Sequence, residues 1–167
     1  VNMSLGGTQP WGETEEIIKG IIEQNILVVA ATGNAQHSES DPDSSFIGYP
    51  AGYPDVVAIG SLGRVNENNE VDYSVSSFFS EIGNNIDYSA PGRNVIAAKS
   101  LTTNDSVPLS GTSMACPYAS GVILLLLKFL KDNDIILDDV RKVNYLLSQM
   151  TTPVYYQDDQ LNTRTLC

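Results

Sequence analysis

The amino-acid sequence predicts an α/β fold in which a mostly parallel sheet is flanked by helices. Two continuous apolar runs, residues 26–31 and 56–62, are rich in β-branched side chains and are typical of parallel strands covered on both faces. Isoleucines at helical spacing come directly before the first of these runs. The order strand, helix, strand at the start of the chain therefore favours parallel strands joined by right-handed crossovers.

The start of the chain is predicted to contain the first strand and helix of this order. Residues 1–5 are predicted to be a short strand, and an amphipathic helix is predicted to begin near Glu13. Its apolar positions recur at helical spacing and are Ile17, Ile18, Ile21 and Ile22. Glu15 and Glu16 follow in the first turn, where negative charge suits the positive end of the helix dipole. A further short strand is predicted at residues 94–98.

A long helix is predicted in the second half of the chain, from near Ser113 to about Lys131. Pro117 falls in its first turn, where the missing N–H costs little, and Lys128 lies near its negative end. The strongly apolar stretch 122–127 is much shorter than the roughly 20 residues that cross a bilayer. We therefore interpret it as part of a buried helix and expect no membrane span.

A second helix is predicted to begin at Asp138, which would be its N-cap, and to end before Pro153. One helical stripe carries its apolar side chains, which are Val140, Val143, Leu147 and Met150. We therefore assign residues 1–153 to one folded unit and residues 154–167 to a polar, loosely held C-terminal tail.

Composition excludes some classes of function. The 167 residues are 42% hydrophobic, which is enough for a substantial core. Nine Lys and Arg against twenty Asp and Glu give a net charge of −11, so the chain should repel phosphate backbones, and we expect no nucleic acid partner. No signal peptide is visible from Val1 onward. Cys116 and Cys167 form neither a metal-ligand spacing nor a disulfide framework, which leaves their redox state open.

Ser113 is the first candidate for chemistry. It lies at the start of the long predicted helix, where free N–H groups and the helix dipole would stabilise a negative charge formed beside it. From this argument alone, a serine that merely caps its helix is the more frequent alternative. Cys116 nearby is interpreted as a small buried apolar residue, with a reactive thiol as the alternative.

Asn34 is the second candidate, at the C-terminal end of the strand at residues 26–31. That edge of an open α/β sheet is where ligands bind. Its side-chain N–H could stabilise a developing oxyanion, although Gly-Asn after a strand is more often a simple turn. Gly6, Gly7 and Gly33 could also be interpreted as parts of phosphate-binding loops. They lack the lysine and the glycine spacing of such loops, so nucleotide binding is discounted.

Residues 111–115, Gly-Thr-Ser-Met-Ala, with Pro117 resemble the nucleophile motif of the subtilisin-like (subtilase, peptidase S8) serine proteases. Further stretches resemble that family in the same order, at residues 2–7, 28–34, 48–50, 88–92 and 140–152. The resemblance implies a three-layer subtilisin-like fold, of which residues 1–153 would form the C-terminal part of the catalytic domain.

The resemblance also assigns roles to residues. It implies that Ser113 is the nucleophile and that Asn34 donates to the oxyanion. The backbone of a substrate-pairing strand, which would bind an extended peptide by β-augmentation, would come from Ser4, Leu5, Gly6 and Gly7. A specificity pocket would be lined by Ala31, Thr32, Gly33 and Gly48. A cis peptide bond is expected before Pro50.

Two members of the Asp, His and Ser triad are missing, and the family's order places them upstream of Val1. We therefore expect the N-terminal part of the same protease, carrying that Asp and His, as a partner. His37 is the only histidine in the chain and is interpreted as a solvated loop residue, since the family does not place its base there. Tyr118 replaces a family histidine that packs and does not react.

No cofactor is expected to be required for the chemistry. The resemblance makes a structural calcium ion an expectation, at a weak family site to which Ala51, Tyr53, Val56 and Asp87 correspond. It also favours a secreted or cell-surface protein, which nothing in these residues establishes.

The sequence therefore predicts a serine endopeptidase that hydrolyses peptide or protein substrates. This chain alone is expected to be inactive, because a serine without its base is a weak nucleophile. The alternative is a catalytically inactive protein of the same fold that binds or regulates a partner. Sequence upstream of Val1 distinguishes the two, since only the protease requires the Asp and His motifs there.

Overall fold

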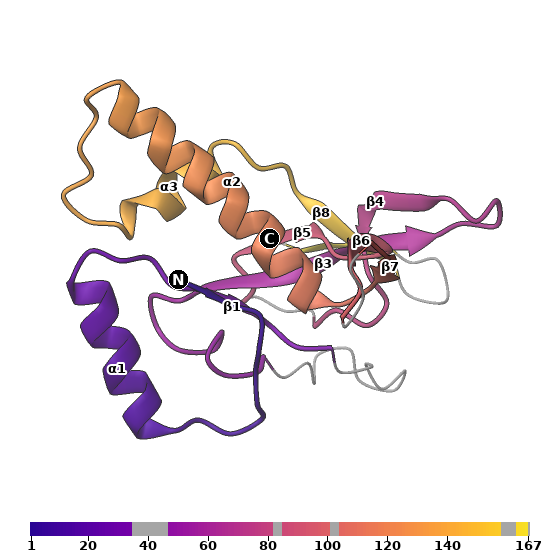
Figure 1. Cartoon of the computed structure of the whole chain (residues 1–167), viewed down its shortest axis with the longest axis horizontal. Coiled ribbons are helices and arrows are strands. Elements are labelled where there is room, and N and C mark those ends of the chain that lie inside the picture. Colours follow the sequence, from indigo (N-terminus) through magenta and orange to yellow (C-terminus); the bar gives the residue numbers. More distant parts are fainter. Residues whose placement is uncertain (35–46, 82–84, 101–103, 158–162, 167) are drawn as a thin grey trace.

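The computed structural model describes residues 1–34, 47–81, 85–100, 104–157 and 163–166, the last few of these, 155–157 and 163–166, by their backbone alone. Figure 1 shows a sheet with α1 (Gly12–Glu23) on one side and α2 (Thr112–Asp132) and α3 (Lys142–Ser148) on the other. The predicted α/β architecture with a mostly parallel sheet flanked by helices is confirmed.

The centre of the sheet is parallel. β1 (Asn2–Met3), β2 (Val29–Ala31), β3 (Val57–Val65) and β5 (Tyr88–Pro91) lie side by side in that order, each parallel to its neighbour. Residues 62–65, the last part of β3, pair with β4 (Val71–Ser76) in the antiparallel direction. β6 (Val95–Ala98) and β7 (Ser106–Leu109) form a separate antiparallel pair.

β2 explains why the sheet needs helices on both faces. Side chains along residues 28–31 alternate between the two faces of the sheet, and all four are buried. Val29 and Ala31 pack in the core beneath α2 and α3, whereas Val28 and Ala30 pack in the core beneath α1. The continuous apolar run therefore predicted a doubly covered strand correctly.

α1 begins within one residue of its predicted start and buries Ile18 and Ile22 against the sheet. Ile17 belongs to the same sequence pattern but is 65% exposed. The buried stripe is therefore narrower than the isoleucine spacing indicated.

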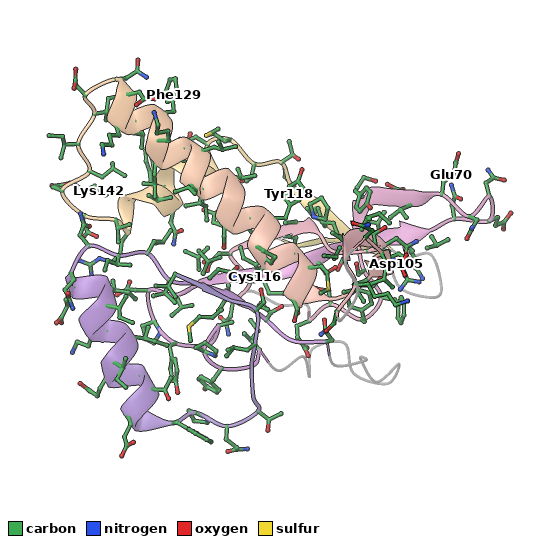
Figure 2. The ribbon with its side chains drawn as sticks, viewed as in Figure 1. Glu70, Asp105, Cys116, Tyr118, Phe129 and Lys142 are labelled. Atoms are coloured by element: carbon green, nitrogen blue, oxygen red, sulfur yellow. The ribbon has the colours of Figure 1, made fainter. Side chains whose placement is uncertain are left out.

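α2 covers the predicted range, but the expectation that it is a buried helix is met on one side only. Its buried residues are Thr112, Ala115, Cys116, Ile123 and Leu130. Leu124, Leu125 and Phe129 are at least 61% exposed. Figure 2 shows Phe129 near the C-terminal end of α2. By length and composition α2 is also long and apolar enough to cross a membrane. One such helix is weak evidence for a membrane span, because the core helix of a soluble protein meets the same criteria.

α3 begins later than predicted, and Asp138 is not its N-cap. The helix starts at Lys142, and the preceding residues form turns in which Asp139 accepts hydrogen bonds from the Arg141 backbone N–H (2.9 Å) and guanidinium group. Asp138 forms an ion pair with the Lys142 side chain. These local side-chain contacts compete with helix formation. The apolar pattern does not record them, so it predicted a helix start at Asp138, which is too early.

Residues 154–167, expected to be a loosely held tail, contain two strands. β8 (Val154–Gln157) pairs in parallel with β4, and β9 (Thr163–Leu166) pairs with β8 in the antiparallel direction. The valine and tyrosines at residues 154–156 favour strand, a signal that the polar residues after them concealed. The domain boundary at residue 153 stays a prediction.

Candidate active site

The carboxyl end of β2, the start of α2 and the segment that follows β1 meet at one edge of the sheet. Their residues line an open cavity of about 600 Å³. It is lined by Leu5, Gly6, Gly7, Thr8, Gln9, Ala31, Thr32, Gly33, Asn34, Gly48, Glu81, Thr112 and Ser113. The structure therefore brings Ser113 and Asn34 together with nearly all the residues predicted to bind substrate, and it places Ser4 beside Ser113.

Ser113 lies in the first turn of α2 and is half-buried. Its Oγ atom donates a hydrogen bond of 3.2 Å to the backbone carbonyl of Ser4. The Thr112 N–H donates to Asn34, and the N–H groups of Met114 and Ala115 donate to the Gly111 carbonyl. Among the described residues, the Ser113 N–H is therefore left available for a negatively charged group at the helix start.

Gly92 positions the loop that carries the nucleophile. Its N–H donates to the Leu62 carbonyl at 3.0 Å, and its own carbonyl accepts from the Gly111 N–H at 2.8 Å. A Cβ atom at Gly92 would lie 2.3 Å from Ser61 Oγ and 2.7 Å from the Gly111 carbonyl oxygen. Only glycine allows this close approach of the two backbones.

Asn34 is oriented by Thr112. The Thr112 backbone N–H donates a 2.8 Å hydrogen bond to Asn34 Oδ1, and the Thr112 hydroxyl lies 3.1 Å from the same oxygen. A backbone N–H only donates, so the amide of Asn34 must present its oxygen to Thr112 and its NH₂ group to the other side. That group is the donor that an oxyanion would need.

Gly33 and Thr112 hold the strand end to the helix start. The Thr112 hydroxyl lies 3.3 Å from the Gly33 nitrogen and 3.1 Å from its carbonyl oxygen, and Thr112 is fully buried. Gly33 has a φ of +120°, which L side chains rarely adopt. The contact therefore fixes where Asn34 leaves β2.

The segment at residues 4–7 is held against residues 48–49. The Gly7 N–H and carbonyl exchange hydrogen bonds of 2.9 and 2.8 Å with Tyr49, and the Gly48 N–H donates to the Thr32 carbonyl at 2.8 Å. The Tyr49–Pro50 peptide bond is cis, as predicted. Neighbouring residues of an extended segment turn their backbone groups to opposite sides, so those of Gly6 would face away from Tyr49.

Glu81 is a residue of this site that the sequence did not predict. It is 2% exposed and lines the cavity, and its Cγ and Oε1 atoms lie 3.5 Å from the position that a Cβ atom at Gly33 would occupy. No motif marks it, since its place in the site depends on how the segment after β4 folds back on β2. The one available signal was an acidic residue directly after a stretch of small and aromatic residues, 76–80.

Cys116 lies in the core, which favours the interpretation as a small buried residue. It is fully buried, with Sγ at 3.2 Å from Asn2 Oδ1 and 3.6 Å from the Val29 carbonyl (Figure 2). Burial raises the pKa of its thiol above the ordinary value, and hydrogen bonds offset part of that effect. A raised pKa lowers the thiolate fraction and hence the reactivity.

The residues that the resemblance suggests for calcium make contacts within the protein. Ala51, Tyr53 and Val56 are buried in the core beneath α1, and Asp87 Oδ2 accepts the Ala58 N–H at 2.8 Å. No group of three His, Cys, Asp or Glu side chains able to hold a metal ion occurs among the described residues. A structural calcium ion stays a prediction, as does its set of carbonyl ligands.

No base accompanies Ser113 within the described part of the chain, where its Oγ bonds to a backbone carbonyl. His37, the single histidine, lies outside the described residues. The described part of the site thus contains a serine, an oriented amide donor and a cavity beside them.

This arrangement agrees with the comparisons with known proteins. The model of the subtilase family matches residues 1–162. The chain belongs to the subtilase family. It is 35% identical over 126 residues to the major intracellular serine protease of Bacillus subtilis (strain 168), an alignment that covers 75% of this chain and 36% of that protein. It is 36% identical over 129 residues to subtilisin NAT of Bacillus subtilis subsp. natto, covering 76% of this chain and 30% of that protein.

Solved structures agree on the fold. The prenylagaramide maturation protease PagA is similar over 99% of this subtilase chain and 55% of its own, with a TM-score of 0.75 and 27% identity. The protease domain of PatA, solved as an S218A mutant, is similar over 91% of this chain and 51% of its own, with a TM-score of 0.71 and 28% identity. The subtilase chain spans about a third of the length of the curated relatives named above.

The relatives leave the compartment undetermined. Two of them are named as intracellular serine proteases, from Bacillus subtilis and Paenibacillus polymyxa, whereas others are named subtilisins. The expectation of a secreted or cell-surface protein is therefore not supported over an intracellular one.

Proposed function

We propose that this subtilase chain supplies the nucleophile and the oxyanion site of a serine endopeptidase. The observation that carries the proposal is the contact between Asn34 and Thr112. It turns the NH₂ group of Asn34 away from Thr112 at the start of the helix that also bears Ser113. A serine that only capped its helix would not need an oriented amide donor beside it.

In the proposed reaction, Ser113 Oγ attacks the carbonyl carbon of a peptide bond while its proton passes to a histidine. The negative charge that forms on the carbonyl oxygen receives hydrogen bonds from Asn34 Nδ2 and from the Ser113 N–H. The C–N bond then breaks, and the leaving amine takes the proton from the histidine. Water hydrolyses the resulting ester on Ser113 and restores the hydroxyl.

The substrate would lie as an extended strand along residues 4–6. Leu5 and Gly6 are exposed. The backbone groups of Gly6 would face away from the Gly7 pairing with Tyr49, as in an extended strand. An added strand would gain main-chain hydrogen bonds there, and its side chain next to the scissile bond would enter the cavity beside Gly33 and Gly48. Gly7, with both backbone groups bonded to Tyr49, would support this strand without pairing to the substrate.

The histidine and its aspartate would come from an N-terminal part of the same protease. β1 pairs with β2 alone among the described strands and leaves its other edge open. An apolar groove follows that edge between Val1, Leu27 and α2, and reaches residues 135–137. An open strand edge beside exposed leucines fits a further strand and helix of the catalytic domain.

A protein of this fold that binds without cleaving is the second candidate. Among the described residues no base contacts Ser113, which agrees with this candidate as well as with a base supplied by the upstream part. Such a protein would keep the cavity and the substrate strand but would lack the aspartate or the histidine.

Peptide hydrolysis separates the two candidates. The complete protease is expected to cleave a fluorogenic peptide library, its Ser113→Ala variant to lose that activity, and this chain alone to show none. Addition of the N-terminal part to the separate chain is expected to restore cleavage. A complete protein that is folded, contains the upstream Asp and His, and cleaves no peptide would support the second candidate.

A further inference from the structure

We propose that Asn2 is a positioning residue of this active site, which holds the substrate-pairing strand in place relative to Ser113. The inference rests on the proposed function, since Ser113 and residues 4–6 have their roles only there. The family resemblance gave roles to residues 4–7 and none to Asn2. Asn2 would act through Ser4 and not by touching the substrate.

The side-chain amide of Asn2 joins two elements of the fold. Its Nδ2 group donates a 3.0 Å hydrogen bond to Ser4 Oγ. Its Oδ1 atom accepts from Ser120 Oγ at 2.9 Å and from Cys116 Sγ at 3.2 Å. The amide therefore ties the segment after β1 to α2, across 118 positions of the sequence in the case of Ser120.

The spacing of these residues explains why they meet. Ser113, Cys116 and Ser120 follow one another at intervals of three and four positions, so they lie along one stripe of α2. Asn2 and Ser4 are two positions apart in an extended segment, so their side chains point to the same side. We call these five residues the polar cluster. Its hydrogen bonds are partly sheltered from water, because Cys116 is fully buried.

The polar cluster reaches the nucleophile through Ser4. The hydroxyl of Ser4 accepts the hydrogen bond from Asn2, and its backbone carbonyl accepts the 3.2 Å hydrogen bond from Ser113 Oγ. The start of α2 and the substrate-pairing strand, which must be placed relative to each other for catalysis, are therefore held by one set of contacts. A substrate paired with residues 4–6 would move with Ser4, and its scissile carbonyl would move relative to Ser113.

The sheet pairing of this segment is short, so side-chain contacts matter for its position. β1 pairs with β2 at Asn2 and Met3, and the next paired residue of the segment in the described sheet is Gly7, which bonds to Tyr49. Residues 4–6 lie between these two points. A misplacement of about 1 Å at a reacting centre can lower a rate about 100-fold, so a small shift of this segment would be costly for turnover.

The test compares two measurements on the complete protease, because positioning and folding affect them differently. Cleavage of a tetrapeptide substrate requires a scissile carbonyl placed against Ser113. Labelling by a small fluorophosphonate requires only an activated Ser113 in a folded site. We expect Asn2→Ala to lower kcat on the tetrapeptide roughly 10- to 100-fold with little change in KM, and to keep a labelling rate within about 3-fold of the wild-type rate.

Ser120 allows a matched set of variants. Ser120→Ala removes one anchor of Asn2 on α2, and we expect kcat to fall about 3- to 10-fold. Ser120→Thr keeps the hydroxyl and should stay near the wild-type rate. The Ser120 hydroxyl also lies 2.9 Å from the Cys116 carbonyl of its own helix. Ser148→Ala is therefore the control, since the Ser148 hydroxyl donates to the Tyr145 carbonyl of its own helix at 2.7 Å and lies on α3. It is expected to leave kcat unchanged.

The outcomes distinguish this inference from the proposed function. A wild-type kcat in Asn2→Ala would overturn the positioning role, as would a parallel loss of cleavage, labelling and resistance to denaturation, which a general loosening of the fold explains. A Ser120→Ala variant as active as Ser148→Ala would show that Ser120 serves only its own helix and does not anchor Asn2. All three results leave the protease assignment intact. A complete wild-type protein with the upstream Asp and His that is neither labelled nor cleaves the tetrapeptide would contradict the proposed function, and the role of Asn2 with it.

Discussion

The backbone N–H of Thr112 donates a 2.8 Å hydrogen bond to Oδ1 of Asn34, across 78 positions of the sequence. This bond joins the end of β2 to the start of α2 and decides which way the Asn34 amide faces. The Thr112 hydroxyl strengthens the link through Gly33 and Asn34. The predictions below follow from this link and from the packing that supports it.

Removal of the Asn34 donor should damage turnover and leave the fold intact. Asn34→Asp keeps an oxygen for Thr112 but has no NH₂ group, and Asn34→Ala lacks both. We expect both variants to lose about 10²–10³ in kcat with little change in KM, a magnitude known from the oxyanion asparagine of subtilisin, a member of this family. Steady-state kinetics of the complete protease measure it, and a loss confined to KM would argue against an oxyanion role.

The Thr112 hydroxyl is expected to act through Asn34. Thr112→Val keeps the buried shape and the backbone bond but removes the hydroxyl contacts to Gly33 and Asn34. We expect kcat to fall about 5- to 10-fold, which corresponds to the loss of roughly 1 kcal/mol for one hydrogen bond. Thr112→Ser retains the hydroxyl and should stay near the wild-type rate. Equal rates for the valine and serine variants would show that the hydroxyl does not position Asn34.

Gly92 should tolerate no side chain. Gly92→Ala places a methyl group 2.3 Å from Ser61 Oγ and 2.7 Å from the Gly111 carbonyl, so the nucleophile loop must shift. We expect the free energy of unfolding to fall by about 1–3 kcal/mol, together with a loss of activity. Gly121→Ala on the exposed side of α2 is the control, since nothing lies within 4 Å of the added Cβ. Chemical denaturation of both variants tests this.

Cys116 should resist alkylation in the folded protein. Burial raises the pKa of its thiol, so at pH 8 the thiolate fraction is small and the sulfur is also shielded. In a Cys167→Ser background we expect iodoacetamide to modify Cys116 only after denaturation, as read by peptide mass spectrometry. Rapid modification under native conditions would mean that Cys116 is exposed or activated.

The sequence predicted those parts of the fold in which the local pattern and the tertiary environment agree. β2 and β3 lie in the centre of the sheet, so burial on both faces leaves a continuous apolar run. β4 was not predicted, because its residues 72–74 are exposed and polar or aromatic and its pairing with β3 is irregular. The start of α3 was misplaced because Asp139 bonds to the turn before it.

Only those residues of the candidate site that belong to a local sequence motif were predictable. Ser113 and Asn34 follow recognisable local patterns, and the structure brings both to one cavity. Glu81 has no such pattern, since it enters the cavity through the fold of the segment after β4. The orientation of the Asn34 amide is likewise a tertiary property, set by a residue 78 positions away.

The central claim, that Ser113 is an activated nucleophile in the assembled protease, is tested most directly by fluorophosphonate labelling. The complete native protein would be labelled, digested and analysed by mass spectrometry, beside its Ser113→Ala variant and a heat-denatured sample. We predict a single phosphonylated serine, Ser113, in the native wild-type protein and no label in either control. A native, folded protein with the upstream Asp and His present and Ser113 unlabelled would contradict the account.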